Sequence, residues 1–178
     1  MPTSIVLLRG INLGKARRVQ MAALREVLSG HGHRDVRTLL QSGNVVLESP
    51  STGAQLEREL EAQLEAGLGF HVDVLVRTRR ELAAVVARNP LASVATDPAR
   101  YLVTFLRAKL DSAVSRRLRA LDVDPERLVI SGREIYTWHP GGLARTDLRK
   151  HLTDRTLGVS SSGRNWSTVT KLLELADA

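Results

Sequence analysis

Apolar and polar residues alternate along residues 1–77 in a pattern that predicts six elements of secondary structure. Short aliphatic and β-branched runs predict strands, whereas apolar residues three or four positions apart predict helices. The expected order is strand, helix, strand, strand, helix, strand, over the segments 4–9, 21–32, 35–41, 44–49, 51–69 and 71–78. This order is that of a ferredoxin-like unit, an antiparallel sheet with both helices on one face.

Two details refine this first half. The middle pair of strands surrounds Ser42-Gly43-Asn44, where Gly43 and Asn44 tolerate positive φ and predict a tight hairpin. In the second helix the apolar stripe recurs every four residues and consists of Leu56, Leu60, Leu64 and Leu68.

The second half repeats part of the pattern. After a helix that ends at Asn89-Pro90, a strand, a helix, a hairpin turning at Ser131-Gly132 and a further helix follow, and a terminal helix closes the chain. The helix before the terminal one is expected to begin at Thr146 or Asp147 and to end at Gly158. The predicted fold class is α+β, with two packed ferredoxin-like subdomains, of which the second is imperfect and has an extra helix. Their expected bounds are 1–77 and 78–178.

Composition narrows the class of protein. The 178 residues are 43% hydrophobic, which is enough for a packed core, and they include no cysteine. Disulfides, thiolate catalysis and zinc–cysteine sites are therefore excluded. The N-terminal segment lacks the features of a signal peptide, and no apolar run is long enough to span a bilayer. We expect a cytoplasmic protein with no membrane partner, and a monomer by default.

Charge is unevenly distributed. The net charge is +7, and residues 78–178 contribute most of it: seventeen basic and eleven acidic side chains, against nine and eight in residues 1–77. A basic half attracts polyanions, so an anionic small molecule or a nucleic acid is the expected partner. The alternative explanation for the basic charge is a GC-rich coding sequence, which favours arginine codons without selection for a ligand. Arginine outnumbers lysine twenty-two to four.

Three loops carry candidate chemistry. In Arg9–Lys15 (RGINLGK), Gly10 and Gly14 let the backbone approach a ligand, and the following helix start offers N–H groups to an anion. This spacing is not that of a P-loop, and a simple glycine-rich connection is the alternative. In Gln41–Asn44 (QSGN), turn chemistry explains the last two residues but does not require the first two.

The third loop is SGRNW, residues 162–166, at the start of the terminal helix. Asn165 or Ser162 is a natural N-cap, and Arg164 beside a helix start would favour an anion. Trp166 either stacks on a nucleobase or packs the helix onto the core. The candidate ligand-binding residues from the three loops are Arg9, Asn12, Lys15, Ser42, Asn44, Arg164, Asn165 and Trp166.

Known catalytic patterns are not found. The five histidines are scattered, and His31-Gly32-His33 predicts a surface loop rather than a pair of metal ligands. No nucleophile elbow occurs, and nothing indicates a paired-carboxylate site. We expect no metal and no cofactor, and the sequence does not decide whether the protein is an enzyme.

Taken together, the motifs RGINLGK, VQMAALR, QSGNVV, NPLA and RNWSTV make the chain resemble an uncharacterised bacterial family, domain of unknown function 1697. The resemblance covers nearly the whole chain and implies a pair of ferredoxin-like subdomains, but it implies no reaction. The chain departs from the family pattern at four positions, where a glycine, a proline, a threonine and an asparagine are usual: Lys15, Gln20, Gly163 and Ser167.

Three functions remain open. The first is a binder of a nucleotide or nucleic acid, although the predicted central strands lack the exposed aromatic residues of RNA-binding sheets. The second is an enzyme that holds a small phosphorylated or carboxylated substrate between the subdomains. The third is that the motifs only maintain turns and packing.

Overall fold

The computed structural model describes residues 1–178, which form two compact units. Unit 1 consists of residues 1–84 together with 171–178, and unit 2 consists of residues 85–170. Each unit contains one four-stranded antiparallel sheet, and the chain is a mixed α+β protein. Two helices pass from one unit into the other, α3 (Arg79–Arg88) and α6 (Trp166–Asp177).

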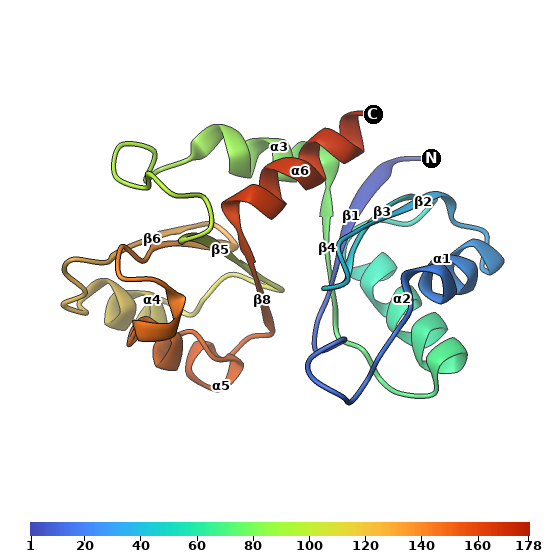
Figure 1. The fold of residues 1–178 in the computed structure, drawn as a ribbon, viewed down its shortest axis with the longest axis horizontal. Coiled ribbons are helices and arrows are strands. Elements are labelled where there is room, and N and C mark those ends of the chain that lie inside the picture. The colour runs from blue at the N-terminus through green and yellow to red at the C-terminus, as the bar shows by residue number, and fades with distance from the viewer. The chain divides into compact units, whose positions relative to one another are not determined.

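The sheet of unit 1 confirms the strands expected in the first half. Its order is β2-β3-β1-β4, and its strands are β1 (Thr3–Leu8), β2 (Arg34–Leu39), β3 (Asn44–Glu48) and β4 (Val74–Thr78). All three neighbouring pairs are antiparallel. Both helices of the unit, α1 (Met21–Gly30) and α2 (Gly53–Leu68), lie on the same face of this sheet (Figure 1).

The core of unit 1 follows directly from the apolar pattern. Strand residues of period two, such as Val6, Val45 and Val74, face the helices, and the predicted stripe of α2 buries Leu56, Leu60 and Leu64 completely. The intervening strand residues point to the other face of the sheet, and the apolar ones among them are buried there as well: Ile5, Leu7, Val46 and Leu75. The strands therefore read as nearly continuous apolar runs because both faces are covered.

Unit 2 has the same strand order as unit 1. Its sheet runs β6-β7-β5-β8, with β5 (Tyr101–Leu106), β6 (Arg127–Ser131), β7 (Glu134–Trp138) and β8 (Ser161–Asn165). The helix after β5 is α4 (Ser112–Arg119), which begins where the Asp111 carboxylate accepts a hydrogen bond from the Ala113 N–H. Leu118 of α4 packs with residues of β5 and β7 in one buried cluster. Figure 1 shows α4 beside the sheet of this unit.

The last strand of unit 2 was not predicted. Ser161–Asn165 (SSGRN) pairs antiparallel with β5, although its sequence has no apolar alternation and its Gly163 weakens strand propensity. The edge of β5 supplies the hydrogen-bonding partners, so tertiary pairing overrides local propensity here.

The helix expected over residues 146–158 is also wrong. The segment forms two 3₁₀ turns, η1 (Leu143–Arg145) and η2 (Leu148–His151), and one short helix, α5 (Asp154–Leu157). A capping box between Thr153 and Thr156 begins a new helix at Asp154 and so separates it from the residues before it. Gly158 ends the helix in the left-handed conformation, as predicted, with φ of 72°.

No helix of the structure combines the length and the apolar character that crossing a membrane requires.

Candidate functional site

Two of the three predicted loops meet at one end of the unit 1 sheet. The loop after β1 begins at Arg9, the turn between β2 and β3 ends at Gly43, and the segment before β4 ends at Asp73. Main-chain hydrogen bonds join them: the Leu8 N–H donates to the Gly43 oxygen at 2.8 Å, and the Arg9 N–H donates to the Asp73 oxygen at 3.0 Å. Main-chain hydrogen bonds therefore hold together segments that are far apart in sequence.

Asn12 organises the loop after β1. Its side-chain nitrogen donates to the main-chain oxygens of Val19 (3.0 Å) and Gln41 (2.6 Å), and its side-chain oxygen accepts from the Val19 N–H (2.8 Å). The residue adopts a left-handed φ of 54°, which asparagine tolerates better than most residues. Asn12 thus fixes the ends of its own loop and attaches that loop to the turn at Gln41.

The turn between β2 and β3 is built by Ser42, Gly43 and Asn44. Gly43 has φ of 84°, as expected, but the second left-handed residue is Leu40 and not Asn44. Asn44 is fully buried at the start of β3 instead, where its amide donates to the Leu39 oxygen (3.0 Å) and to the Ser42 hydroxyl (2.9 Å). The side chain closes the turn, which is why position 44 does not need positive φ.

An open hollow of about 760 Å³ lies beside this loop. We call it the β1–α1 hollow, and it is lined by Asn12, Gly14, Arg18, Val19, Gln20, Met21 and Gln41. Helix α1 begins at its wall, and neither a capping side chain nor an acidic residue occupies the first turn. The first N–H groups of α1 and the positive end of its dipole therefore remain available at the hollow.

The charge of the surrounding segment has one sign. Residues 9–20 contain four basic side chains and no acidic one: Arg9, Lys15, Arg17 and Arg18. Lys15 and Arg18 are exposed, and the Arg17 guanidinium lies 5.6 Å from the centre of the Phe70 ring, a cation–π distance. This segment is locally basic even though unit 1 as a whole is not.

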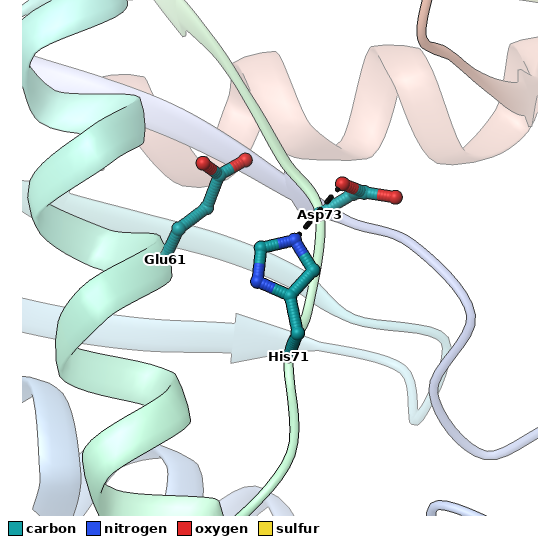
Figure 2. A group of neighbouring side chains, drawn as sticks. All are labelled: Glu61, His71 and Asp73. Atoms are coloured by element: carbon teal, nitrogen blue, oxygen red, sulfur yellow. Dashed lines mark hydrogen bonds and ion pairs between the residues drawn. The ribbon is translucent and has the colours of Figure 1, made fainter.

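A second group of polar side chains was missed by the sequence analysis. Glu61 of α2 lies beside His71 and Asp73, which precede β4, and one ligand atom from each lies within 4.8 Å of the others (Figure 2). His71 Nε2 is 3.2 Å from the Asp73 carboxylate, and its Nδ1 is 3.5 Å from the Glu65 carboxylate. These hydrogen bonds, first to Asp73 and then to Glu65, raise the pKa of His71 above its ordinary value.

The five histidines are scattered along the sequence, but in the structure His71 belongs to a group of polar side chains. Only two short spacings in the sequence indicate this group. His71 and Asp73 are two residues apart, and Glu61 and Glu65 are one helical turn apart. The surface loop expected at His31-Gly32-His33 is also only half correct. His31 is exposed, but His33 is buried, with Nε2 at 2.8 Å from the Gln63 side-chain oxygen.

The third predicted loop belongs to unit 2. Asn165 is the N-cap of α6, because its side-chain oxygen accepts from the Thr168 N–H at 2.9 Å. The Trp166 ring stacks on the buried Tyr101 ring, with centroids 4.7 Å apart and planes inclined by 15°. Arg164 donates to the Ser162 hydroxyl (2.7 Å) and to the Gly163 oxygen (2.8 Å). These contacts explain the motif by capping and packing, and ligand binding at these three residues stays a prediction.

Unit 2 also has a smaller hollow of about 280 Å³, in which none of the predicted site residues lies. Its lining includes four carboxylates, those of Asp122, Asp124, Glu126 and Asp147, but only one guanidinium, that of Arg145. Glu126 is engaged by the buried His139, whose Nδ1 lies 3.1 Å from its carboxylate. This hollow is therefore a poor host for an anion.

Comparisons with known proteins agree with the fold and assign no catalysed reaction to the chain. No curated protein matches the sequence. Among solved structures, the chain is similar over 98% of both chains to a conserved bacterial protein, SP0830, from Streptococcus pneumoniae, with 24% sequence identity and a TM-score of 0.80. At this identity the likeness shows the fold alone. The family described as "Protein of unknown function (DUF1697)" matches residues 1–136, and the chain therefore belongs to that family.

Proposed function

We propose that the protein binds a phosphate-bearing anion, a nucleotide or a nucleic acid, in the β1–α1 hollow. The observation that carries the proposal is the hollow itself, which borders a segment of four basic and no acidic side chains. Phosphate oxygens accept hydrogen bonds from lysine, arginine and main-chain N–H groups. The lining of the hollow supplies the last two, and Lys15 follows its lining residue Gly14 in the sequence.

The start of α1 gives the anion a defined position. Gln20 and Met21 line the hollow, so a phosphate placed there faces the uncapped first turn of the helix. The exposed Lys15 and Arg18 would approach the same phosphate from the loop. Their side chains lie in water, so their contribution is expected to fall as salt is added.

Two exposed leucines favour a ligand that also has an apolar part. Leu13 is 73% exposed and Leu40 is 57% exposed, and they flank the Asn12–Gln41 hydrogen bond from the two loops. A nucleobase beside the phosphate would cover such side chains, whereas inorganic phosphate would not. This supports a nucleotide unit, free or in a polymer, over a simple anion.

The predicted residues have different parts in this proposal. Arg9, Lys15 and Arg18 supply charge, whereas Asn12, Ser42 and Asn44 build the loop and turn that shape the hollow. Arg164, Asn165 and Trp166 are in unit 2 and take no part in it.

For the fold we propose two ferredoxin-like units that arose by duplication. Identical strand orders support this, since β2-β3-β1-β4 and β6-β7-β5-β8 are the same arrangement of first, second, third and fourth strands. A cytoplasmic location is the accompanying proposal, supported by the lack of cysteine.

A matched pair of charge changes tests the binding proposal. Lys15→Gln and Lys109→Gln each remove one exposed lysine, the first beside the hollow and the second in unit 2. We expect Lys15→Gln to weaken binding of labelled nucleotides or oligonucleotides about threefold at low salt, and Lys109→Gln to leave it unchanged.

The ligands distinguish the two sources of phosphate. Saturable binding of ATP identifies a nucleotide site, whereas binding of single-stranded oligonucleotides without ATP binding identifies a nucleic-acid site. Equal loss in the two variants, or no binding of either ligand by the wild type at low ionic strength, would show that the proposal is wrong.

A further inference from the structure

We propose that Glu61, His71 and Asp73 form a binding site for a divalent transition-metal ion such as Zn²⁺ or Mn²⁺. One imidazole nitrogen and two carboxylates are ligands that these ions accept. The three side chains come from two places in the sequence, the last half of α2 and the segment before β4, and Figure 2 shows them turned toward one another.

The separation of His71 and Asp73 suits a shared ion. Two ligands bound at about 2.0–2.1 Å in tetrahedral geometry lie roughly 3.3 Å from each other. His71 Nε2 and Asp73 Oδ1 are 3.2 Å apart, so their separation already fits a shared ion, and the two side chains would only have to turn from facing each other to facing the ion. The Glu61 oxygen lies within 4.8 Å of both and would come closer by rotation of its carboxylate.

The neighbours of the three residues orient them for this task. Glu65, one turn further along α2, lies 3.5 Å from His71 Nδ1, the ring nitrogen that does not face Asp73. A carboxylate that accepts from one ring nitrogen while a metal binds the other is the usual arrangement around metal-bound histidine. Glu61 Oε1 accepts from the Val74 N–H at 3.1 Å, which holds that carboxylate beside the first residue of β4.

The group is accessible from solvent. The side chains of His71 and Asp73 are 52% and 40% exposed, so an ion bound there would keep positions for water or another ligand. Three protein ligands with an open position are typical of catalytic rather than structural zinc sites. The ion would also lie next to the loop that borders the β1–α1 hollow, because the main-chain oxygen of Asp73 accepts a hydrogen bond from the Arg9 N–H.

A bound proton is the competing explanation for the same geometry. A protonated His71 would donate to Asp73 and Glu65 at once, and the group would then be an exposed ion-pair cluster. A metal and a proton compete for the same ring nitrogen, so measurements of metal binding alone decide between the two.

The test uses the full chain, freed of metal by a chelator, and titrates it with Zn²⁺ by calorimetry and with Co²⁺ by visible absorption. We expect one equivalent to bind, with a Co²⁺ spectrum that requires a nitrogen ligand. Asp73→Asn and His71→Ala should each weaken binding more than tenfold. Glu65→Gln should weaken it about tenfold, as expected for a residue that orients a ligand.

His31→Ala is the matched control, because His31 is another exposed histidine of unit 1 and is not in the group. Its affinity for Zn²⁺ should equal that of the wild type, and circular dichroism should show that all variants are folded. The proposal is overturned if the wild type binds no stoichiometric metal, or if His31→Ala and His71→Ala lose affinity equally. Because the metal is titrated without any anion, this result is independent of phosphate binding in the hollow.

Discussion

The Asn12 side chain donates a 2.6 Å hydrogen bond to the main-chain oxygen of Gln41, twenty-nine residues further along the chain. The loop after β1 and the turn between β2 and β3 are therefore held together directly. The shape of the β1–α1 hollow depends on this contact, since Asn12 and Gln41 both line it and come from different segments. The framework of the hollow can thus be perturbed separately from the basic side chains around it.

The first prediction concerns Asn12 itself. Asn12→Ala removes three side-chain hydrogen bonds and places an alanine at φ of 54°, and we expect the free energy of unfolding to fall by about 2–4 kcal/mol. Asn12→Gly loses the same hydrogen bonds but tolerates that φ, so it should lose about 1 kcal/mol less. Denaturant unfolding of both variants measures the difference. Unfolding of both at the wild-type denaturant midpoint would contradict the structural role of Asn12.

The second prediction concerns Gly43. A Cβ at this position would lie 2.7 Å from the Leu8 Cβ and 3.0 Å from a terminal carbon of Ile11, at φ of 84°. Gly43→Ala should lower the free energy of unfolding by about 3 kcal/mol or more, because both contacts are with buried residues of a packed region.

Gly32→Ala is the control for Gly43→Ala. Gly32 has φ of 87°, yet nothing lies within 4 Å of its added Cβ, so this variant reports backbone strain without the clash. It should lose only about 1–2 kcal/mol. Equal losses in the two variants would mean that the close approach of Leu8 is relieved by movement of the turn.

The third prediction concerns Trp166. Its stacking on Tyr101 predicts that Trp166→Ala lowers the free energy of unfolding by about 3 kcal/mol, whereas Trp166→Phe retains a ring and loses less. In a Trp138→Phe background, the fluorescence of Trp166 should not change when nucleotides are added. A near-neutral Trp166→Ala variant, or saturable quenching by a nucleotide, would instead make this residue part of a binding surface.

The fourth prediction is an effect of alkaline pH. Burial raises the pKa of Tyr101 from 10.0 to about 12, so its neutral form is favoured in the folded state. Its stabilising contribution is complete below pH 10, where the unfolded tyrosine is also protonated, and is lost as pH rises from 10 to 12. At pH 11 the loss for this group should be about 1 kcal/mol.

Tyr101→Phe isolates this contribution, because phenylalanine keeps the ring against Trp166 and has no proton to lose. The difference in free energy of unfolding between wild type and Tyr101→Phe should be constant from pH 7 to 9 and should shift against the wild type above pH 10. A difference that stays constant up to pH 11.5 would show that the Tyr101 hydroxyl reaches water.

The elements predicted best are those with a strong apolar period. The leucine stripe of α2 and the alternating valines of β4 each bury one face, so pattern and structure agree closely. Strand β8 and the segment 143–157 were not predicted correctly, because their structure does not depend on an apolar period. The first exists because β5 offers an open edge, and the second is divided by a capping box between Thr153 and Thr156, so neither leaves a periodic signal.

The candidate site was predicted only in part for a similar reason. Glycine and asparagine in RGIN and QSGN indicate turns, and the structure shows two such turns joined through Asn12 and Gln41. The approach of Glu61 to His71 and Asp73 depends on the packing of α2 beside β4, which no spacing in the sequence reports. Local motifs therefore predict loops well, but they do not predict which side chains meet across the fold.

The strand order also determines when each sheet can be completed during translation. The unit 1 sheet has all its strands once Thr78 has been translated, whereas β5 ends at Leu106 and must wait for β8, which begins at Ser161. At about 5–20 residues per second, a nascent chain leaves one edge of β5 unpaired for roughly 3–11 seconds. The polar sequence of β8 arrives last to cover an aliphatic and aromatic strand. This interval is when a growing chain of this protein would most need a chaperone.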